Sequence, residues 1–321
     1  MDKVLGIGNA LVDIMIQLKD DSTLKKFSLK KGSMQLSERQ FADEINSATE
    51  GFEKSQSSGG SAANTIHGIA SLGAEAGYIG KVGDDEFGEF FSNDMKEHYI
   101  QPFLLKGKND TGRAMALISP DSERTFATYL GAAIELIDTD LKSEQFKDYK
   151  YLHIEGYLVQ NHELMLKAAE LAKANNMKIS IDMASYNVVE ENLEFLKNYV
   201  KNNVDIVFAN EEESKAFTGK EPEESLNVLA EQCEIAVVKI GSKGSLVKSE
   251  GNVYKIDPIK VNPVDTTGAG DLFASGFLYG LTNNMPLDKC GQLGSICAGK
   301  VIEVIGSKMS NEAWKEIRKI I

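Results

Sequence analysis

The most chemically suggestive stretch of the sequence is a run of small residues between two carboxylates. It reads Asp265-Thr266-Thr267-Gly268-Ala269-Gly270-Asp271, and an apolar segment follows it. Small residues at the start of a helix leave its backbone N–H groups open, and the helix dipole then favours an anion. A carboxylate beside an anion site is electrostatically costly unless it has a task, such as taking a proton from an attacking hydroxyl. The structural alternative is an N-terminal capping turn, in which Asp and Thr are favoured.

Two common phosphate-binding motifs do not account for this stretch. The Walker A pattern G-x-x-x-x-G-K-[ST] occurs nowhere in the sequence. Gly6-Ile7-Gly8 lacks the third glycine of a dinucleotide fingerprint, and Asn9 occupies the turn. The sequence therefore predicts an anion site of another kind.

A second glycine-rich stretch, Gly59-Gly60-Ser61-Ala62-Ala63-Asn64, also precedes an expected helix. Paired glycines allow a ligand to approach the backbone closely, and the amide of Asn64 can hydrogen-bond a hydroxyl. A loop that ends in a helix N-cap is the alternative interpretation. The stretch from Gly80 to Gly88 has the same ambiguity, because a glycine turn with an acidic first helical turn is stable without any ligand.

Asn9 and Asp13 lie in an otherwise apolar run near the N-terminus. Polar groups are costly when they are buried without partners. A vicinal diol would satisfy the carboxylate with two hydrogen bonds, so Asp13 is a candidate substrate ligand. The alternative is the exposed edge of a strand.

Asn210-Glu211-Glu212-Glu213 follows an expected strand over residues 205–209. Ligands bind at the carboxyl ends of parallel strands. An N-x-x-E pair puts two oxygen-bearing side chains within one helical turn, which suits Mg²⁺ with its bound waters. A solvated acidic helix start is the alternative.

Strands and helices alternate along the chain, and they must position these residues. The expected strands cover residues 4–8, 76–80, 151–154, 178–182, 205–209, 235–240, 245–248, 253–256 and 259–261. The expected helices cover residues 61–72, 86–99, 162–175, 193–201, 223–231, 269–281 and 287–304, with Trp314 in a terminal helix. Such alternation predicts an α/β fold whose mainly parallel sheet has helices on both faces.

Two segments break this rhythm, at residues 13–36 and 103–129. Both look extended, and neither contains a crossover helix. Residues 113–119 and 124–129 predict a hairpin. We expect these segments to form a small separate sheet that covers the main one.

Composition limits the classes of function. The chain has 321 residues and a formal net charge of −13, which argues against binding to bulk nucleic acid or an anionic membrane surface. We expect Cys233, Cys290, Cys297 and the histidines His67, His98, His153 and His162 to be structural, because they form no C-x-x-C or H-E-x-x-H motif. The sequence contains no long apolar run, so we expect a cytoplasmic protein without a membrane span.

Taken in order, the motifs resemble those of the ribokinase-like, or PfkB, family of carbohydrate and nucleoside kinases. G-G-S-A-A-N with the later G-D-D-E-F-G resembles the family's N-terminal signature, and D-T-T-G-A-G-D-L-F-x-x-G resembles its C-terminal signature. N-E-E-E matches the family's N-x-x-E motif, and Val238–Gly244 resembles its nucleotide-side turn. The similarity runs from about residue 3 to about residue 306.

The resemblance implies a doubly wound α/β sheet flanked by helices, with a small β-sheet lid. We therefore predict one ribokinase-like kinase domain over residues 1–321, with a lid formed by segments near 10–40 and 100–130. The implied reaction transfers the γ-phosphoryl group of ATP to a hydroxymethyl group, with Mg²⁺ as cofactor. The implied partners are a small nucleoside or sugar, with no nucleic acid and no membrane, and the chain would act as a monomer or a homodimer.

The resemblance implies a role for each residue of this sequence that matches a motif of the family. Asp271 resembles the catalytic base, and Gly268, Ala269 and Gly270 resemble the anion hole. Asn210 and Glu213 resemble the magnesium-water network. Asp265 and Thr267 resemble a monovalent-cation (K⁺) site that Gly306 and Ser307 complete. The implied nucleotide-binding residues are Asn210, Lys239, Gly241, Lys243, Gly244, Thr267 and Gly299.

Within the family, the sequence resembles the adenosine-kinase-like members. Gly8-Asn9-Ala10-Leu11-Val12-Asp13-Ile14 is similar to their G-N-x-x-x-D-I, and Ser61 replaces the lysine of typical ribokinases. Arg124 resembles an arginine that holds the transferring phosphate. The implied substrate-binding residues are Asn9, Asp13, Gly59, Gly60 and Asn64.

The predicted function is phosphorylation of the 5′-hydroxyl of a nucleoside, with adenosine first. One alternative is a sugar kinase for ribose or fructose. The other is a protein that binds a nucleoside or nucleotide without turnover, which the intact Asp271 disfavours.

Overall fold

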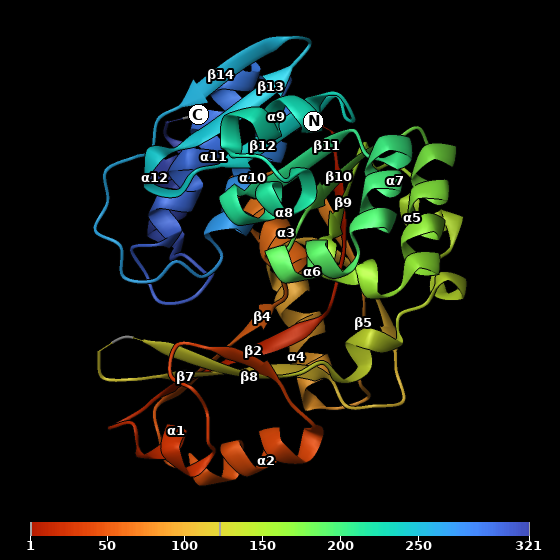
Figure 1. Ribbon diagram of the computed structural model, residues 1–321. Helices are drawn as coiled ribbons and strands as arrows, with labels where there is room; N and C mark the ends of the chain where they lie inside the picture. The colour runs from red at the N-terminus through yellow and green to blue at the C-terminus, as the bar shows by residue number, and fades with distance from the viewer. Residues whose placement is uncertain (1, 122, 321) are drawn as a thin grey trace.

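The computed structural model describes residues 2–121 and 123–320, and its strands form a large and a small sheet. Figure 1 shows the small sheet beneath the large one, with helices α1 and α2 on its far face. The predicted α/β class with a small second sheet is confirmed.

The large sheet has nine strands in the order β14-β13-β12-β11-β10-β9-β1-β5-β6. All its pairs are parallel except those made by β13 with β12 and β14. The interior strand β1 pairs with both β5 and β9, so the chain winds away from it in two directions. The bounds are β1 Val4–Ile7, β5 Ala76–Val82, β6 Ile100–Lys106, β9 Tyr151–Glu155, β10 Lys178–Asp182, β11 Ile206–Asn210, β12 Ile235–Lys239, β13 Ser245–Ser249 and β14 Asn252–Ile256.

Helices bury both faces of this sheet, as its continuous apolar strands require. One core lies under α3 (Ser61–Leu72), α4 (Glu86–Glu97), α10 (Ala269–Thr282), α11 (Leu287–Val301) and α12 (Asn311–Arg318). The other lies under α5 (His162–Ala174), α6 (Tyr186–Glu191), α7 (Leu193–Asn203), α8 (Glu211–Thr218) and α9 (Pro222–Ala230). Neighbouring strand residues alternate between the two cores: Val237 belongs to the first, and Ala236 and Val238 belong to the second.

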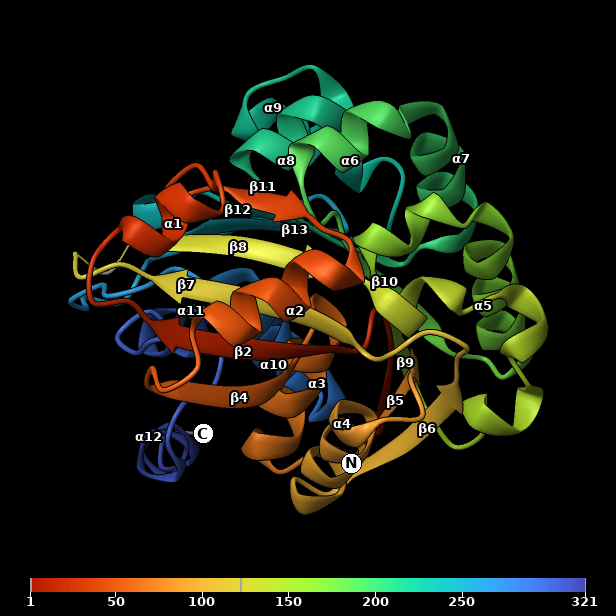
Figure 2. The same cartoon turned by 90° about the horizontal axis from the view of Figure 1, so that it is seen from below.

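The small sheet has five strands in the order β3-β8-β7-β2-β4. The predicted hairpin is confirmed, because β7 and β8 pair antiparallel, and β2 lies parallel to β7. Figure 2 shows α1 and α2 lying across one face of this sheet. The bounds are β2 Leu11–Gln17, α1 Ser22–Lys26, β3 Met34–Leu36, α2 Arg39–Ala48, β4 Lys54–Gly59, β7 Gly112–Ile118 and β8 Arg124–Tyr129.

Several local features differ from the sequence expectations. Helix α1 (Ser22–Lys26) interrupts the segment 13–36 that was expected to be extended, and helix α2 (Arg39–Ala48) was not expected. Residues 100–106 form β6 at the edge of the large sheet, so only the later part of the second irregular segment joins the small sheet. Residues 54–59 form β4, although Lys-Ser-Gln-Ser-Ser-Gly has almost no apolar content, because β2 supplies its hydrogen-bonding partner. Residues 259–261 form no strand, and Ile259 instead packs on Gly299, where an added Cβ would lie 2.2 Å from Ile259 Cγ1.

Short 3-10 turns complete the described chain, at Gly131–Glu135, Asp138–Asp140, Ser143–Phe146, Gly156–Gln160 and Gly241–Lys243. Within residues 2–121 and 123–320, no helix is both long and apolar enough to span a membrane.

Candidate active site

The site forms where α3 and α10 begin side by side. The two helices cross closely because Gly68 has no side chain: an added Cβ would lie 2.3 Å from Ser275 Oγ. Ser275 Oγ also donates a hydrogen bond to the carbonyl of Thr65 at 2.8 Å. The crossing brings the two glycine-rich stretches of the sequence together.

Asp271 lies in the first turn of α10, and its carboxylate is held from α3. Ser61 Oγ donates to one carboxylate oxygen at 2.8 Å, and Asn64 Nδ2 donates to the other at 3.0 Å. Asn64 is fixed in turn by Ser307 Oγ, which donates to Asn64 Oδ1 at 2.8 Å. Burial raises the pKa of Asp271 to about 6, although these hydrogen bonds and Lys239 act in the opposite direction. At neutral pH the carboxylate is therefore ionised and held in one orientation.

The start of α10 is open to an anion. Gly268 has φ 75°, a conformation that L side chains rarely adopt, and an added Cβ would lie 2.8 Å from Ser307 Cβ. The first N–H groups of an α-helix lack the usual partner four residues back. Here the Ala269 N–H donates to the Thr266 carbonyl at 3.2 Å, and the Leu272 N–H donates to the Gly268 carbonyl at 2.8 Å. Lys239 Nζ lies within 3.0 Å of the place that a Cβ on Gly270 would occupy. The N–H groups and this ammonium group together create a positive region beside Asp271.

Arg124 reaches this region from the small sheet. Its guanidinium pairs with Asp265, and Nη1 donates to Thr267 Oγ1 at 3.0 Å. Its Nη2 is buried and has no hydrogen-bond partner among the described residues. Burial lowers the pKa of Arg124, and the neighbouring carboxylates Asp265 and Asp13 favour its charged form. Arg124 therefore ties β8 to the loop before α10 and keeps one donor available.

The segments predicted to hold a monovalent cation lie next to each other. Asp265 Oδ1 accepts hydrogen bonds from the Thr267 backbone and hydroxyl at 3.1 and 2.9 Å, and Oδ2 accepts one from the Gly306 N–H at 2.8 Å. Because its carboxylate already pairs with Arg124, an additional cation here would rely on backbone carbonyls.

Asp13 faces the same space from β2. It lies opposite Ser57 in the sheet, and a Cβ on Gly59 would lie 2.3 Å from Asp13 Cγ, so glycine is needed at position 59. No hydrogen bond from another described residue reaches this carboxylate. Burial raises the pKa of Asp13 to about 6, while Lys308 and Arg124 lower it and Asp271 raises it. Asp13 is thus a carboxylate with open acceptor sites.

Asn9, predicted as a substrate ligand, is engaged within the protein. Its Nδ2 donates to Glu155 Oε1 at 2.6 Å, and Glu155 Oε2 accepts from the Ala62 N–H at 3.2 Å. Gly60 has φ 99°, and an added Cβ would lie 2.1 Å from the Asn9 carbonyl oxygen. Asn9 and Glu155 therefore hold the Gly60 turn. The sequence analysis missed Glu155, although a carboxylate at the end of a central parallel strand was a usable signal.

Asn210 and Glu213 satisfy each other in a capping box. Glu213 N–H donates to Asn210 Oδ1 at 2.8 Å, and the Asn210 N–H and Nδ2 donate to the two oxygens of Glu213, each at 2.7 Å. These two residues therefore have a structural role at the start of α8, whether or not a ligand binds there. Each carboxylate oxygen has a second acceptor site, so hydrogen bonds from metal-bound water remain compatible with this geometry.

A buried ion pair lies close enough to Glu213 and Asp271 to affect the pKa of both. Lys239 Nζ lies 2.8 Å from Asp182 Oδ2, at the ends of β12 and β10. Burial, followed by the charge of Asp182, raises the pKa of Glu213 to about 7. Asp182 and Asp271 both favour the protonated form of Lys239. The sequence analysis missed Asp182, which ends a predicted strand just as Asn210 does.

The remaining predicted nucleotide residues lie further along the edge of the sheet. Gly241 and Lys243 are exposed. Gly244 has φ 94°, and an added Cβ would lie 1.9 Å from the Ile256 carbonyl oxygen, so its turn requires glycine. Gly299 is covered by Ile259 and has a packing role in this conformation.

Lys308 is a third residue that the sequence analysis missed. Its Nζ is buried and has no hydrogen-bond partner among the described residues. Burial lowers its pKa to about 8, against the opposing effects of Asp94, Asp13 and Asp271. No motif or spacing singled it out, since its neighbours come from distant parts of the chain.

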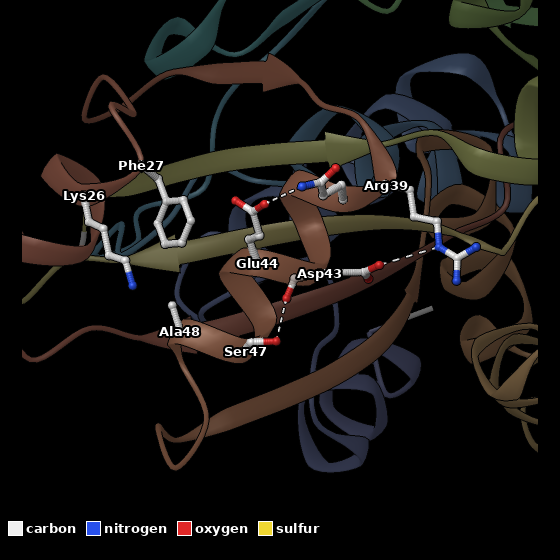
Figure 3. Close-up of a pocket in the computed structure, with 8 residues that line it drawn as sticks. Lys26, Phe27, Arg39, Asp43, Glu44, Ser47 and Ala48 are labelled. Carbon is white, nitrogen blue, oxygen red and sulfur yellow. Dashed lines mark hydrogen bonds and ion pairs between the residues drawn. The ribbon is translucent and has the colours of Figure 1, made fainter.

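A hollow of about 890 Å³ lies between α1 and α2 on the far face of the small sheet. Figure 3 shows Lys26, Phe27 and Arg39 around it, and no predicted site residue lines it. The chemistry that the sequence predicts is concentrated at α3 and α10 instead.

Comparisons with known proteins show the family and the fold of the chain. The sequence profile of the pfkB family carbohydrate kinases matches residues 30–314. The structure of adenosine kinase from Sinorhizobium meliloti is 34% identical, with a TM-score of 0.89 over 100% of this chain and 99% of that chain. A probable sugar kinase from Rhizobium etli CFN 42 is 34% identical, with a TM-score of 0.89 over 99% and 98% of the two chains. By sequence, 5-dehydro-2-deoxygluconokinase of Bacillus subtilis is 28% identical over 279 residues, which cover 82% of this chain and 86% of that protein.

Proposed function

Because this chain belongs to the PfkB family of carbohydrate kinases, we propose that it transfers the γ-phosphoryl group of ATP to the 5′-hydroxymethyl group of a nucleoside, with adenosine first. The observation that carries the proposal is Asp13. Its carboxylate has open acceptor sites and faces the same space as Asp271. A ribose diol can donate two hydrogen bonds to it, which leaves the 5′ end of the nucleoside free to reach Asp271.

Asp271 acts as the base in this proposal. Ser61 and Asn64 hold its carboxylate while it takes the proton from the attacking 5′-hydroxyl. Phosphoryl transfer depends mainly on positioning and charge stabilisation. The backbone at Gly268, Ala269 and Gly270 stabilises the developing negative charge. Arg124 contributes Nη2, for which the described residues offer no other partner.

ATP is the co-substrate expected for this family, and Mg²⁺ is part of the proposal. When bound, Mg²⁺ offsets negative charge on the phosphates. Asn210 and Glu213 would hold it through water, and the second acceptor site on each Glu213 oxygen fits that task. ATP would lie along Lys239, Gly241, Lys243 and Gly244, with Thr267 and Gly299 at its border. We also propose a K⁺ site formed by Asp265, Thr267, Gly306 and Ser307.

We keep the prediction of one kinase domain with a lid, and we propose that the lid is the small sheet of β2, β3, β4, β7 and β8. Of the predicted lid segments 10–40 and 100–130, residues 100–106 belong to the large sheet, and β4 at residues 54–59 is an addition. The small sheet contributes Asp13 and Arg124, so its position affects both the substrate and the phosphate. A lid that closes over the substrate excludes water that would otherwise hydrolyse ATP. We also propose that the protein lies in the cytoplasm, where ATP is available. In the same proposal it acts as a monomer or a homodimer.

A sugar kinase is the second candidate. Relatives such as the Bacillus subtilis 5-dehydro-2-deoxygluconokinase and the Rhizobium etli probable sugar kinase favour it. A carboxylate that accepts two hydroxyls would hold a sugar as well as a nucleoside. Binding without turnover has no comparable support, because the relatives are kinases and Asp271 is present.

A substrate panel tests the choice. Purified enzyme with ATP and Mg²⁺ is given adenosine, 2′-deoxyadenosine, ribose, fructose and 5-dehydro-2-deoxygluconate, and kcat/KM is measured for each. We expect adenosine to exceed every sugar at least about tenfold, because the base adds buried area that a sugar lacks. A sugar that exceeds adenosine would overturn the nucleoside assignment and leave the kinase assignment intact.

A further inference from the structure

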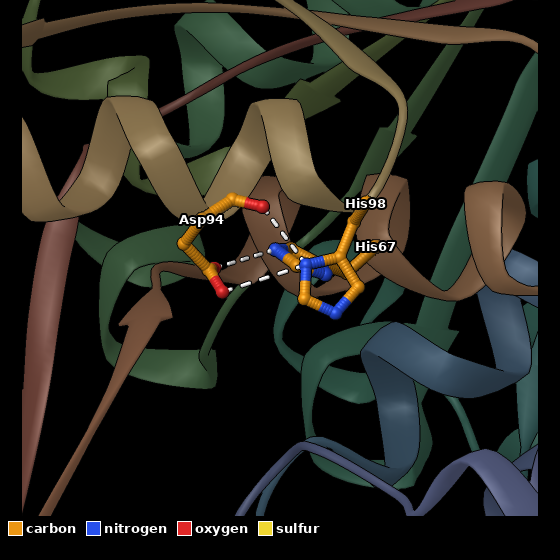
Figure 4. A group of neighbouring side chains, drawn as sticks. All are labelled: His67, Asp94 and His98. Atoms are coloured by element: carbon orange, nitrogen blue, oxygen red, sulfur yellow. Dashed lines mark hydrogen bonds and ion pairs between the residues drawn. The ribbon is translucent and has the colours of Figure 1, made fainter.

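Two histidines and one aspartate converge where α3 meets the end of α4, one helical turn beyond Asn64. His67 Nε2, the Asp94 carboxylate and His98 Nδ1 all lie within 4.8 Å of one another. His67 Nε2 is 3.0 Å from Asp94 Oδ2, and His98 Nδ1 is 3.4 Å from Asp94 Oδ1 (Figure 4). None of these residues has a role in the proposed kinase reaction.

The three side chains are positioned by two packed helices. Asp94 and His98 are four residues apart at the end of α4, so they project from the same helical face. His67 comes from the middle of α3 and is 4% exposed, so packing fixes its position. The side chain of His98 is 43% exposed, which gives an ion access from solvent.

An outer shell orients the central carboxylate. Ser58 Oγ donates a hydrogen bond to Asp94 Oδ2. Ser58 Oγ also lies 2.8 Å from His67 Nε2, and this second contact must give way when His67 Nε2 binds an ion. Such second partners orient ligands and raise the affinity of metal sites. His98 Nδ1 lies 2.8 Å from the Asp94 carbonyl oxygen, which also accepts the His98 backbone N–H at 3.2 Å. The Asp94 carbonyl therefore still accepts a hydrogen bond from the His98 backbone N–H if His98 Nδ1 binds an ion.

A cavity of about 220 Å³ adjoins the three side chains. Ser57 and Lys308 also line it, and Ser57 Oγ and Lys308 Nζ are buried without hydrogen-bond partners among the described residues. The cavity can hold the waters that complete a coordination shell. The positive charge of the Lys308 ammonium disfavours a cation in this cavity. Three carboxylates, those of Asp94, Asp13 and Asp271, offset that charge.

We propose that His67, Asp94 and His98 bind one divalent transition-metal ion, such as Zn²⁺ or Co²⁺, separate from the Mg²⁺ of the kinase reaction. Two imidazoles and a carboxylate suit these ions, whereas Mg²⁺ and Ca²⁺ prefer oxygen ligands throughout. The bound ion would join α3 to α4. Because α3 also carries Ser61 and Asn64, the ion would stiffen the helix that holds Asp271.

The test uses the full chain without a histidine tag. Co²⁺ is titrated in the presence of excess Mg²⁺, which fills the oxygen-ligand sites, and the visible bands of protein-bound Co²⁺ are recorded. We expect saturation at one ion per chain and displacement by Zn²⁺. An absence of saturable Co²⁺ binding to the wild type would overturn the proposal.

Variants locate the ion. His98→Ala changes a half-exposed side chain, and we expect Co²⁺ affinity to fall at least about tenfold. Ser58→Ala should weaken it about 10- to 100-fold through the orientation of Asp94. His162→Ala, on α5, removes an exposed histidine elsewhere and should bind as the wild type does.

Thermal unfolding supplies a second readout that does not depend on kinase activity. A ligand that binds only the native state raises the midpoint of unfolding. We expect Zn²⁺ to raise the Tm of the wild type and of His162→Ala, and to leave the Tm of His98→Ala unchanged. Equal Co²⁺ affinity and equal Zn²⁺ response in His98→Ala and the wild type would contradict the assignment.

Discussion

At the scale of single residues, burial sets the chemistry of Asp271. Its carboxylate lies among Ser61, Asn64 and Lys239, and desolvation still raises its pKa to about 6. A base with a pKa just below the working pH is mostly ionised and still accepts a proton readily. Burial raises the pKa of Asp271 towards the value that suits a general base, and it also lowers the stability of the folded protein. The effect on turnover and the effect on stability can both be measured on one variant.

The variant Asp271→Asn keeps the shape of the side chain and removes the proposed base. We expect turnover to fall by about 10²–10⁴, which corresponds to about 3–5.5 kcal/mol in the activation free energy. ATP affinity should be retained or increase, because a negative charge beside the phosphates is lost. Steady-state kinetics and equilibrium ATP binding measure the two quantities, and near-normal turnover would remove Asp271 from the reaction.

The same variant should be more stable than the wild type above pH 6. The folded-state pKa of about 6 exceeds the ordinary value of 3.8, so the folded protein binds more protons between these pH values. The contribution of Asp271 to the free energy of unfolding therefore falls as pH rises through this window. We expect Asp271→Asn to gain about 1–3 kcal/mol at pH 8, and to lose this advantage below pH 4. Denaturant unfolding at both pH values tests the sign.

Lys308 should influence substrate binding through Asp13. Its positive charge lowers the pKa of Asp13, which burial has raised to about 6. In Lys308→Met the pKa of Asp13 should rise further, so KM for the nucleoside should increase between pH 6 and 7 while kcat at saturation changes little. Lys308→Arg should restore the wild-type pH profile. A pH-independent loss of kcat in Lys308→Met would indicate a purely structural role.

The sequence could predict Asp13, Asn64 and Asp271, because each stands in a recognisable local pattern. Glu155 and Asp182 carried a weaker signal, since each is a carboxylate at the end of a strand, but their partners lie far away in the chain. Lys308 carried no local signal. Asp182 meets Lys239, which is 57 residues away. Such pairs depend on strand order, which no local pattern contains.

At the scale of elements, the close crossing of α3 and α10 is the feature on which the site depends. Gly68 and Ser275 meet where the helices cross, and each helix carries half of the hydrogen-bonded group around Asp271. Both helices were predicted from the sequence, because each follows a glycine-rich stretch. Strand β4 was not predictable in this way, because its hydrogen bonds to β2, rather than its own composition, make it a strand.

The variant Gly68→Ala tests this crossing. Its new Cβ would lie 2.3 Å from Ser275 Oγ and 2.6 Å from Ser275 Cβ, so the helices must separate. We expect the free energy of unfolding to fall by about 1–3 kcal/mol, together with a loss of kcat as Ser61 moves from Asp271. The double variant Gly68→Ala/Ser275→Gly moves the side-chain volume to the other helix and should recover part of both losses. No recovery would mean that the contact does not limit the approach of the helices.

At the scale of the whole molecule, the two sheets divide the proposed tasks. The large sheet and its helices hold Asp271 and the anion-binding backbone, and the small sheet contributes Asp13 and Arg124. The chain has a net charge of −13, so affinity for a polyphosphate must come from local donors rather than from the overall field. Alternating strands and helices made the large sheet predictable, while the mixed pairing of the small sheet required the structure.

The most direct test of the proposed function combines a change in the enzyme with a change in the substrate. Wild type and Asp13→Ala are compared on adenosine and 2′-deoxyadenosine, and kcat/KM is measured for all four combinations. Loss of the 2′-hydroxyl removes one charge-assisted hydrogen bond to Asp13, worth about 1.5–3 kcal/mol. The wild type should therefore prefer adenosine by about 10- to 150-fold, and Asp13→Ala should lose most of this preference. If Asp13→Ala discriminates the two nucleosides as strongly as the wild type does, Asp13 does not hold the ribose and the central claim is contradicted.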